Sequence, residues 1–128
     1  MGMTADTRKI HDATVAVTTQ YAPPVVANVP YFGVNVDRAK HAGFTIDNPA
    51  GVTADYSFQV SNMTDDEVKM GLDDWSDYDF VPTLNIAGAA KKYMELVNLG
   101  FRRVRIKIVA SVAGGNKVVI RSHVKGES

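Results

Sequence analysis

The strongest constraint on the fold is an alternation near the end of the chain. Basic and apolar residues alternate there one by one, in the order Arg103, Val104, Arg105, Ile106, Lys107 and Ile108. Because successive side chains of a strand point to opposite faces of a sheet, this pattern predicts a strand with one buried face and one basic face. Residues 113–116, Ala-Gly-Gly-Asn, favour a hairpin loop, and residues 117–121 are predicted to return as the antiparallel partner.

Other short spans alternate in the same way and are separated by turn signals. They cover residues 14–19, 31–36, 43–46 and 54–62, and residues 47–51, Asp-Asn-Pro-Ala-Gly, predict a turn. Residues 89–100 predict a short helix or turn that leads into a strand. Many short strands with little helix predict an all-β protein, an antiparallel β-sandwich or jelly roll.

The first 30 residues differ from the rest of the chain. Pro23, Pro24 and Pro30 interrupt an apolar stretch, which rules out a helix and favours extended backbone. We predict an extended N-terminal arm over residues 1–30 and a β-sandwich domain over residues 31–128, with a surface loop packed on its own domain as the alternative to the arm. Removing residues 1–30 is then expected to leave a folded sandwich.

Charge is balanced overall but segregated along the chain. The 14 basic and 14 acidic residues cancel, yet residues 65–79 hold seven acids and one lysine, whereas residues 91–128 hold nine bases and two acids. Such segregation can be neutralised within one fold, can associate copies, or can attract an acidic partner. Pairing within or between copies is favoured over nucleic acid, because no aromatic residues are interleaved with the bases for stacking.

Composition narrows the function classes. The chain has 128 residues and no cysteine, which fits one domain without disulfides, thiol nucleophiles or cysteine metal sites. No apolar run reaches the roughly 20 residues that span a bilayer, and the start lacks the apolar core of a signal peptide. We therefore expect synthesis in a cytoplasm and no membrane partner.

Known catalytic motifs are missing from the sequence. It contains no nucleophile elbow, phosphate-binding loop, dinucleotide glycine motif or zinc-binding histidine pair, and its three histidines are isolated. We expect no enzymatic activity and no cofactor. The weak candidates for a metal site are the aspartates that could offer oxygens to calcium, Asp73, Asp74, Asp77 and Asp79, although their spacing lacks the glycine and glutamate of an EF-hand. A solvated acidic loop, or an acidic patch that meets a neighbouring copy, is the alternative.

Five segments carry a resemblance to a known group of proteins. They are Phe-Gln-Val-Ser-Asn at 58–62, Trp-Ser-Asp-Tyr at 75–78, Leu-Asn-Ile-Ala-Gly at 84–88, Gly-Phe-Arg-Arg-Val-Arg-Ile-Lys-Ile at 100–108 and the glycine pair at 114–115. Over residues 54–125 the chain resembles small bacteriophage virion proteins with a β-sandwich akin to discoidin or carbohydrate-binding folds. The resemblance implies a structural protein of the virion, most directly a capsid decoration or cement protein. The alternative is a carbohydrate-binding or receptor-binding module of a phage fibre or tail.

This role implies contact surfaces rather than a catalytic site. The expected partners are the major capsid protein or other virion proteins, together with further copies of the chain, a trimer being favoured. Trp75 could stack on a sugar, but its expected role is an anchor in the core or at its rim. The residues predicted to form contacts are Pro23, Pro24, Val25, Val26, Pro30, Tyr31, Phe32, Trp75, Asp77, Tyr78, Arg103 and Arg105.

Overall fold

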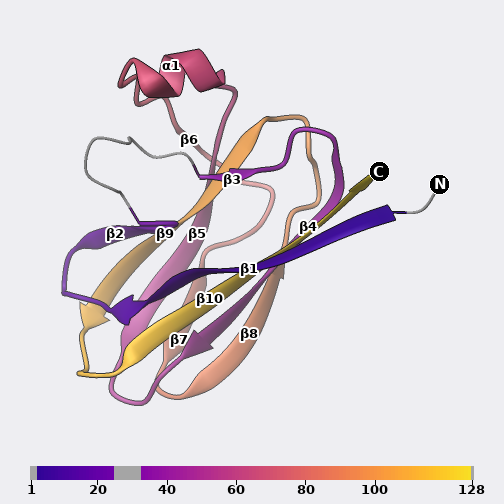
Figure 1. Cartoon of the computed structure of the whole chain (residues 1–128). Coiled ribbons are helices and arrows are strands. Elements are labelled where there is room, and N and C mark those ends of the chain that lie inside the picture. Colours follow the sequence, from indigo (N-terminus) through magenta and orange to yellow (C-terminus); the bar gives the residue numbers. More distant parts are fainter. Residues whose placement is uncertain (1–2, 25–32, 128) are drawn as a thin grey trace.

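Two antiparallel sheets pack face to face in the computed structural model, which describes residues 3–24 and 33–127 (Figure 1). One sheet has the order β1 (Met3–Thr14), β10 (Lys117–Glu127), β4 (Ala39–Asn48) and β8 (Ala90–Glu95). The other has the order β2 (Thr19–Ala22), β9 (Arg103–Val112), β5 (Thr53–Ser61) and β6 (Ser76–Asp77), with β3 (Val34–Asn35) on β9 and β7 (Leu84–Ala87) on β5. The prediction of an all-β antiparallel sandwich is confirmed.

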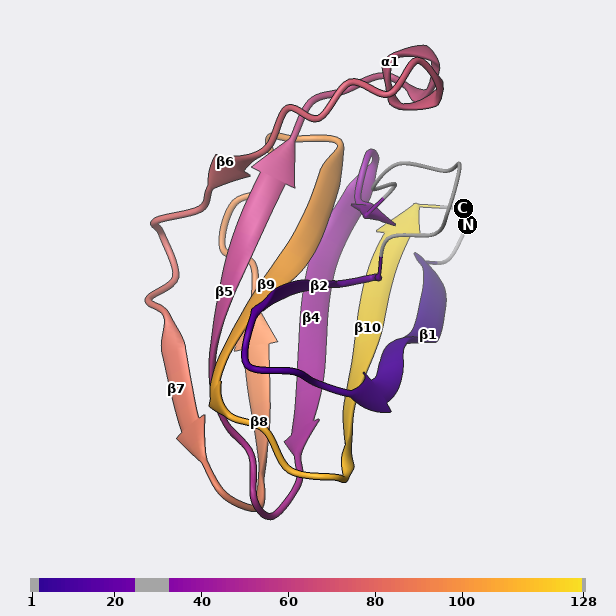
Figure 2. The same ribbon diagram turned by 90° about the vertical axis from the view of Figure 1, so that its left-hand side faces the viewer.

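The chain crosses repeatedly between the two sheets. It leaves the four-stranded sheet after β1, returns to it for β4, leaves for β5, returns for β8, leaves for β9 and returns for β10. Figure 2 shows the two layers side by side, with α1 (Asp65–Lys69) beyond the end of β5. The consecutive strands β8, β9 and β10 therefore alternate between the sheets, whereas β5, β6 and β7 stay in one.

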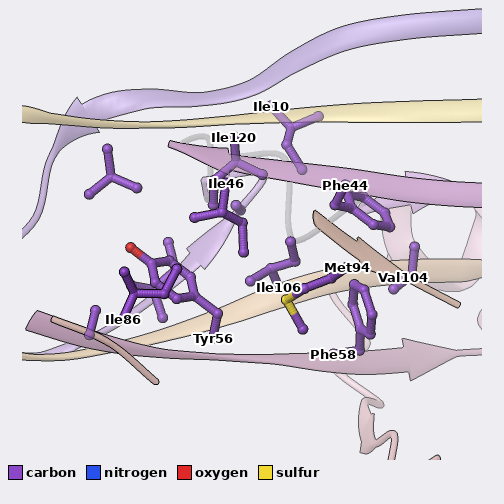
Figure 3. Close-up of a cluster of buried hydrophobic side chains, with 14 of the residues drawn as sticks. Ile10, Phe44, Ile46, Tyr56, Phe58, Ile86, Met94, Val104, Ile106 and Ile120 are labelled. Carbon is purple, nitrogen blue, oxygen red and sulfur yellow. The ribbon is translucent and has the colours of Figure 1, made fainter. Parts of the chain in front are cut away.

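The core fills the space between the sheets (Figure 3). Phe44 of β4 and Phe58 of β5 meet there with ring centroids 5.2 Å apart, and both side chains are fully buried. One polar link crosses this core: the Tyr56 hydroxyl donates to Asn48 Oδ1 at 2.5 Å, and Asn48 Nδ2 donates to the carbonyls of Val52 and Gly88, each at 2.8 Å. The buried amide is thus satisfied, as an interior polar group must be.

The sequence pattern correctly predicted which side of most strands is buried, and it predicted one turn. Tyr56, Phe58 and Val60 share the inward side of β5, as their alternation predicted. A turn is present at the end of the predicted range 47–51, after β4 ends at Asn48, and Gly51 in it has φ of 84°, which a glycine adopts without strain. Residues 90–95 form the strand β8 without a preceding helix.

The predicted hairpin of residues 103–121 is wrong. Both strands exist, but β9 pairs with β2, β3 and β5, whereas β10 pairs with β1 and β4. The glycine-containing loop at 113–116 therefore carries the chain from one sheet to the other. A turn-forming sequence allows the chain to reverse but does not decide which strand lies alongside it.

The N-terminal residues differ from the predicted arm. β1 pairs with β10 in register from Met3–Glu127 to Thr14–Lys117, with an irregularity between Lys9 and His11, and β2 pairs with β9. Residues 3–14 and 19–22 are thus strands of the sandwich itself, because an extended chain satisfies its backbone hydrogen bonds best beside another strand. Of the predicted contact residues, Val25, Val26, Pro30, Tyr31 and Phe32 lie outside the described residues.

Candidate interaction surface

The acidic segment, residues 65–79, folds back onto the basic face of β9. It begins with α1, whose N-cap is Thr64, and the Thr64 and Glu67 side chains form a reciprocal capping box with the backbone. The Asp65 carboxylate pairs with the Arg103 guanidinium, and Arg103 Nε donates to the carbonyl of Met63 at 3.2 Å. The side chain of Arg103 is only 6% exposed as a result.

Arg105 lies next along the same face and is stacked between two aromatic rings. Its guanidinium carbon is 3.7 Å from the centroid of the Tyr21 ring and 4.3 Å from that of Trp75. Arg105 Nε donates to Gln59 Oε1 at 2.8 Å, and Gln59 Nε2 donates to Asp77 Oδ1 at 3.0 Å. The predicted contact residues Trp75, Asp77 and Arg105 are brought together in one cluster.

The expectation that β9 presents a basic face outward is therefore wrong for its first half. Arg103 and Arg105 are both buried, and the acidic segment supplies part of their cover. This is the internal neutralisation that charge segregation allowed. Burying an arginine requires partners for its charge, and the cluster provides a carboxylate for Arg103 and an amide oxygen and two aromatic faces for Arg105.

Trp75 serves as an anchor, which was the expected role, rather than as an open platform. One side of its ring lies on Arg105, and a Cβ added at Gly33 would lie 2.6 Å from Trp75 Cη2. Gly33 also has φ of 64°, so both the conformation and the close approach require glycine. Among the described residues the indole Nε1 has no hydrogen-bond partner.

Tyr78, a predicted contact residue, is buried. Its ring meets Phe58 and Phe101 edge on, and its hydroxyl donates to the carbonyl of Asn98 and accepts from Asn98 N at 2.8 Å. These bonds tie the acidic segment to the connection between β8 and β9. Tyr78 therefore positions the segment instead of contacting a partner.

The calcium candidates do not form a site. Asp73, Asp74, Asp77 and Asp79 are all described, and across residues 3–24 and 33–127 no three histidine, aspartate or glutamate side chains gather closely enough to hold a metal ion. Asp77 is occupied by Gln59 instead. Oxygen ligands must converge from several directions on calcium, and successive residues of an extended loop point apart.

A cleft of about 1060 Å³ opens between β1, the turn before β4 and α1. Pro23, Pro24 and Arg103 line it, so the structure places these predicted contact residues around one depression. His11 lies in its wall, with Nδ1 bonded to the carbonyl of Val118 at 2.7 Å. Acidic and basic side chains both line the cleft.

The outward face of the four-stranded sheet has a different character. Cationic side chains project from it, those of Lys117, Arg121 and Lys125 on β10 and Lys91 on β8, and all four are exposed. We call this the cationic face, although the register also places two acids on it, Asp47 and Glu95. In its edge strand β8, Tyr93, 55% exposed, lies over Gly43, where the ring leaves no room for a Cβ.

A chain of hydrogen bonds fixes Tyr93 in this position. Its hydroxyl lies 3.0 Å from His41 Nε2, and His41 Nδ1 lies 2.8 Å from Glu95 Oε1. Partial burial and the negative charge of Glu95 raise the pKa of Tyr93 above its ordinary value, so it stays a neutral hydroxyl. The arrangement orders an aromatic ring on an open sheet face.

The acidic segment also carries exposed apolar side chains. Met70 is 85% exposed and Leu72 is 44% exposed, and the next residue after the segment, Phe80, is 70% exposed. Sequence reasoning did not single out Met70 and Leu72, nor Tyr21, Gln59 and the His41–Tyr93 pair. The contacts of Tyr21 with Arg105 and of His41 with Tyr93 join strands far apart in the sequence, so no local pattern could reveal them.

No known protein family, curated protein or solved structure matches this chain. In the part of the chain that the structure describes, no helix is long and apolar enough to cross a membrane.

Proposed function

We propose that this protein is a non-enzymatic structural protein of a bacteriophage particle, one that decorates the capsid shell. The resemblance of residues 54–125 to small virion proteins supports this role, and the β-sandwich is the fold that the resemblance implies. The observation that carries the proposal is the polarity of the surface. An acidic segment with exposed apolar side chains and a separate cationic face suit contacts that repeat around a symmetry axis.

The proposed mechanism is stabilisation by mass action. A protein that binds only the assembled shell shifts the equilibrium toward assembly, by an amount that grows with its concentration. A stable contact buries about 1600 Å² in total. The side of the molecule around Pro24 and the cleft is the surface that we assign to the shell, because the predicted contact residues Pro23, Pro24 and Arg103 meet there.

The test uses capsid shells assembled without this protein. Purified protein should sediment with the shells, saturate at a fixed ratio to the shell subunits and raise the temperature at which the shells disrupt. The variant Pro24→Asp should weaken binding about tenfold, equivalent to about 1.4 kcal/mol. Pro82→Asp is the matched control. Pro82 is also exposed, but it lies between β6 and β7 and does not line the cleft. A wild-type protein that stays in the supernatant would overturn the proposal.

A carbohydrate-binding module is the second candidate, and one observation favours it. Tyr93 presents an ordered, exposed ring on a sheet face, which is the geometry that stacks on a sugar. Trp75 does not offer such a platform, because it lies against Arg105. The variant Tyr93→Ala tests this second candidate: it should abolish binding of the protein to a sugar.

A further inference from the structure

The acidic segment and the cationic face are two surfaces that internal contacts leave open. Asp65 and Asp77 of the segment have partners in Arg103 and Gln59. No hydrogen bond or ion pair is seen, among the described residues, for the side chains of the remaining aspartates of the segment, Asp66, Asp73, Asp74 and Asp79. The segment therefore presents negative charge beside the exposed Met70, Leu72 and Phe80.

The cationic face has the complementary composition. Across the described residues no ion pair engages Lys91, Lys117, Arg121 or Lys125. The exposed ring of Tyr93 lies on the same face, two residues from Lys91 in the edge strand β8, and is held in place by His41. Burying this ring against an apolar side chain therefore costs little side-chain entropy. A negative surface with apolar anchors and a positive surface with an ordered aromatic ring match in both charge and apolar content.

These two surfaces cannot meet within one molecule. The cationic face is the side of β10 and β8 that points away from the core, whereas the acidic segment is tied to β5 and β9 in the other sheet. Figure 1 shows α1 beyond the end of the six-stranded sheet, with β10 and β8 in the other layer. Within the described residues, contact between these two surfaces therefore requires a second copy of the chain.

The edges of the four-stranded sheet are poorly suited to pairing with a second copy. The edge at β1 carries Asp6, Arg8 and Asp12 and has a register irregularity near Ile10, and the edge at β8 carries Lys91 and Lys92. Charged side chains and irregular register are the features by which edge strands avoid adding another strand. At this sheet, contact through the side chains of the cationic face is therefore favoured over contact through its edges.

We propose that this chain associates head to tail with copies of itself, the acidic segment and Phe80 of one copy docking on the cationic face of the next. Because the two surfaces differ, the contact is heterologous and generates a ring if its rotation closes. This inference rests on the proposed function for its biological purpose, since a decoration protein must repeat over a symmetric shell. The contact itself is a property of the isolated protein.

The experiment measures the mass of the purified full chain by light scattering and sedimentation, from micromolar to millimolar concentration. We expect a closed oligomer at low ionic strength that dissociates in 1 M salt, because exposed charges are screened there within about 3 Å. Two variants should each be monomeric: Asp73→Lys with Asp74→Lys, and Arg121→Glu with Lys125→Glu. Mixed in equal amounts they should associate again, because the reversed charges are complementary.

The matched control is Lys92→Glu with Lys107→Glu, which changes net charge as much as the second variant but lies off the cationic face. It should keep the wild-type mass. A wild-type chain that is monomeric at every concentration, or a mixture that stays monomeric while both variants remain folded by circular dichroism, would overturn the inference. If the wild-type chain is monomeric but binds shells, the inference fails and the proposed function stands. If it is an oligomer that does not bind shells, the proposed function fails and the inference stands.

Discussion

The outward faces of β9 and β10 begin from similar sequences and end in opposite environments. Both strands carry basic residues on the side away from the core, yet Arg105 on β9 is buried whereas Arg121 on β10 is exposed. The difference comes from what the chain does next to each strand. The acidic segment and Tyr21 cover the face of β9, whereas β10 is flanked within its own sheet by β1 and β4. Alternation thus predicts the buried apolar side but not whether the polar side meets water.

The largest effect is expected from removing β1, which would turn β10 into an edge strand. Deletion of residues 1–14 removes the whole β1–β10 ladder and the cover that Ile10 and His11 give to the core. We expect a loss of more than about 4 kcal/mol, a large part of the roughly 5–15 kcal/mol that stabilises a domain. Urea unfolding followed by circular dichroism measures it. If the truncated chain unfolded at the wild-type urea midpoint, the prediction of a separate arm would be supported and the strand assignment of β1 contradicted.

A direct comparison of the two faces comes from Arg105→Ala and Arg121→Ala. Loss of Arg105 leaves Gln59 Oε1 without its donor and removes the charge between two rings. We expect Arg105→Ala to lower the free energy of unfolding by about 3 kcal/mol, in the range found when one partner of a buried charged network is deleted. Arg121→Ala should change it by less than about 0.5 kcal/mol, as for an exposed residue.

Chemical denaturation of both variants gives the two values under the same conditions. The Arg105 effect should also be insensitive to salt, because buried charges are screened much less than exposed ones. Equal effects for the two arginines would show that the covered and open faces do not differ energetically.

The smallest expected effect is a change in how the free energy of unfolding depends on pH, which compares a tyrosine in the core with one on the open face. Burial raises the pKa of Tyr56 to about 12, from 10.0. Because the folded state holds this proton more tightly, the stabilisation is full below pH 10 and is lost as pH rises toward 12. Tyr56→Phe should flatten that decline and cost about 1 kcal/mol at neutral pH through loss of the bond to Asn48.

Tyr93→Phe is the comparison on the open face. Burial and the charge of Glu95 also raise the pKa of Tyr93, but this side chain is more exposed than Tyr56, so Tyr93→Phe should flatten the alkaline decline less than Tyr56→Phe. Urea midpoints measured from pH 8 to pH 11.5 test both variants. A Tyr56→Phe protein with the same alkaline decline as the wild type would remove the assigned role of this hydroxyl.

Particular residues show how far local reasoning reaches. The inward side of β5 and the turn ending at Gly51 follow from nearest-neighbour chemistry, and both were predicted. Trp75 as an anchor was also expected, but its neighbours Tyr21 and Gly33 belong to segments more than 40 residues away. The pairing of Asp65 with Arg103 agrees with the charge segregation, although the sequence did not specify which acid meets which base.

The sequence by itself determined that this chain is an all-β sandwich, because the alternation of apolar residues fixes which side of each strand is buried. It also determined that opposite charges would be separated along the chain. Only the tertiary structure decided that β9 and β10 lie in different sheets, that the N-terminal residues are strands and that one basic face is covered while the other is open. The physical reason is that strand pairing and charge burial depend on contacts between residues distant in sequence, and local preferences do not select among them.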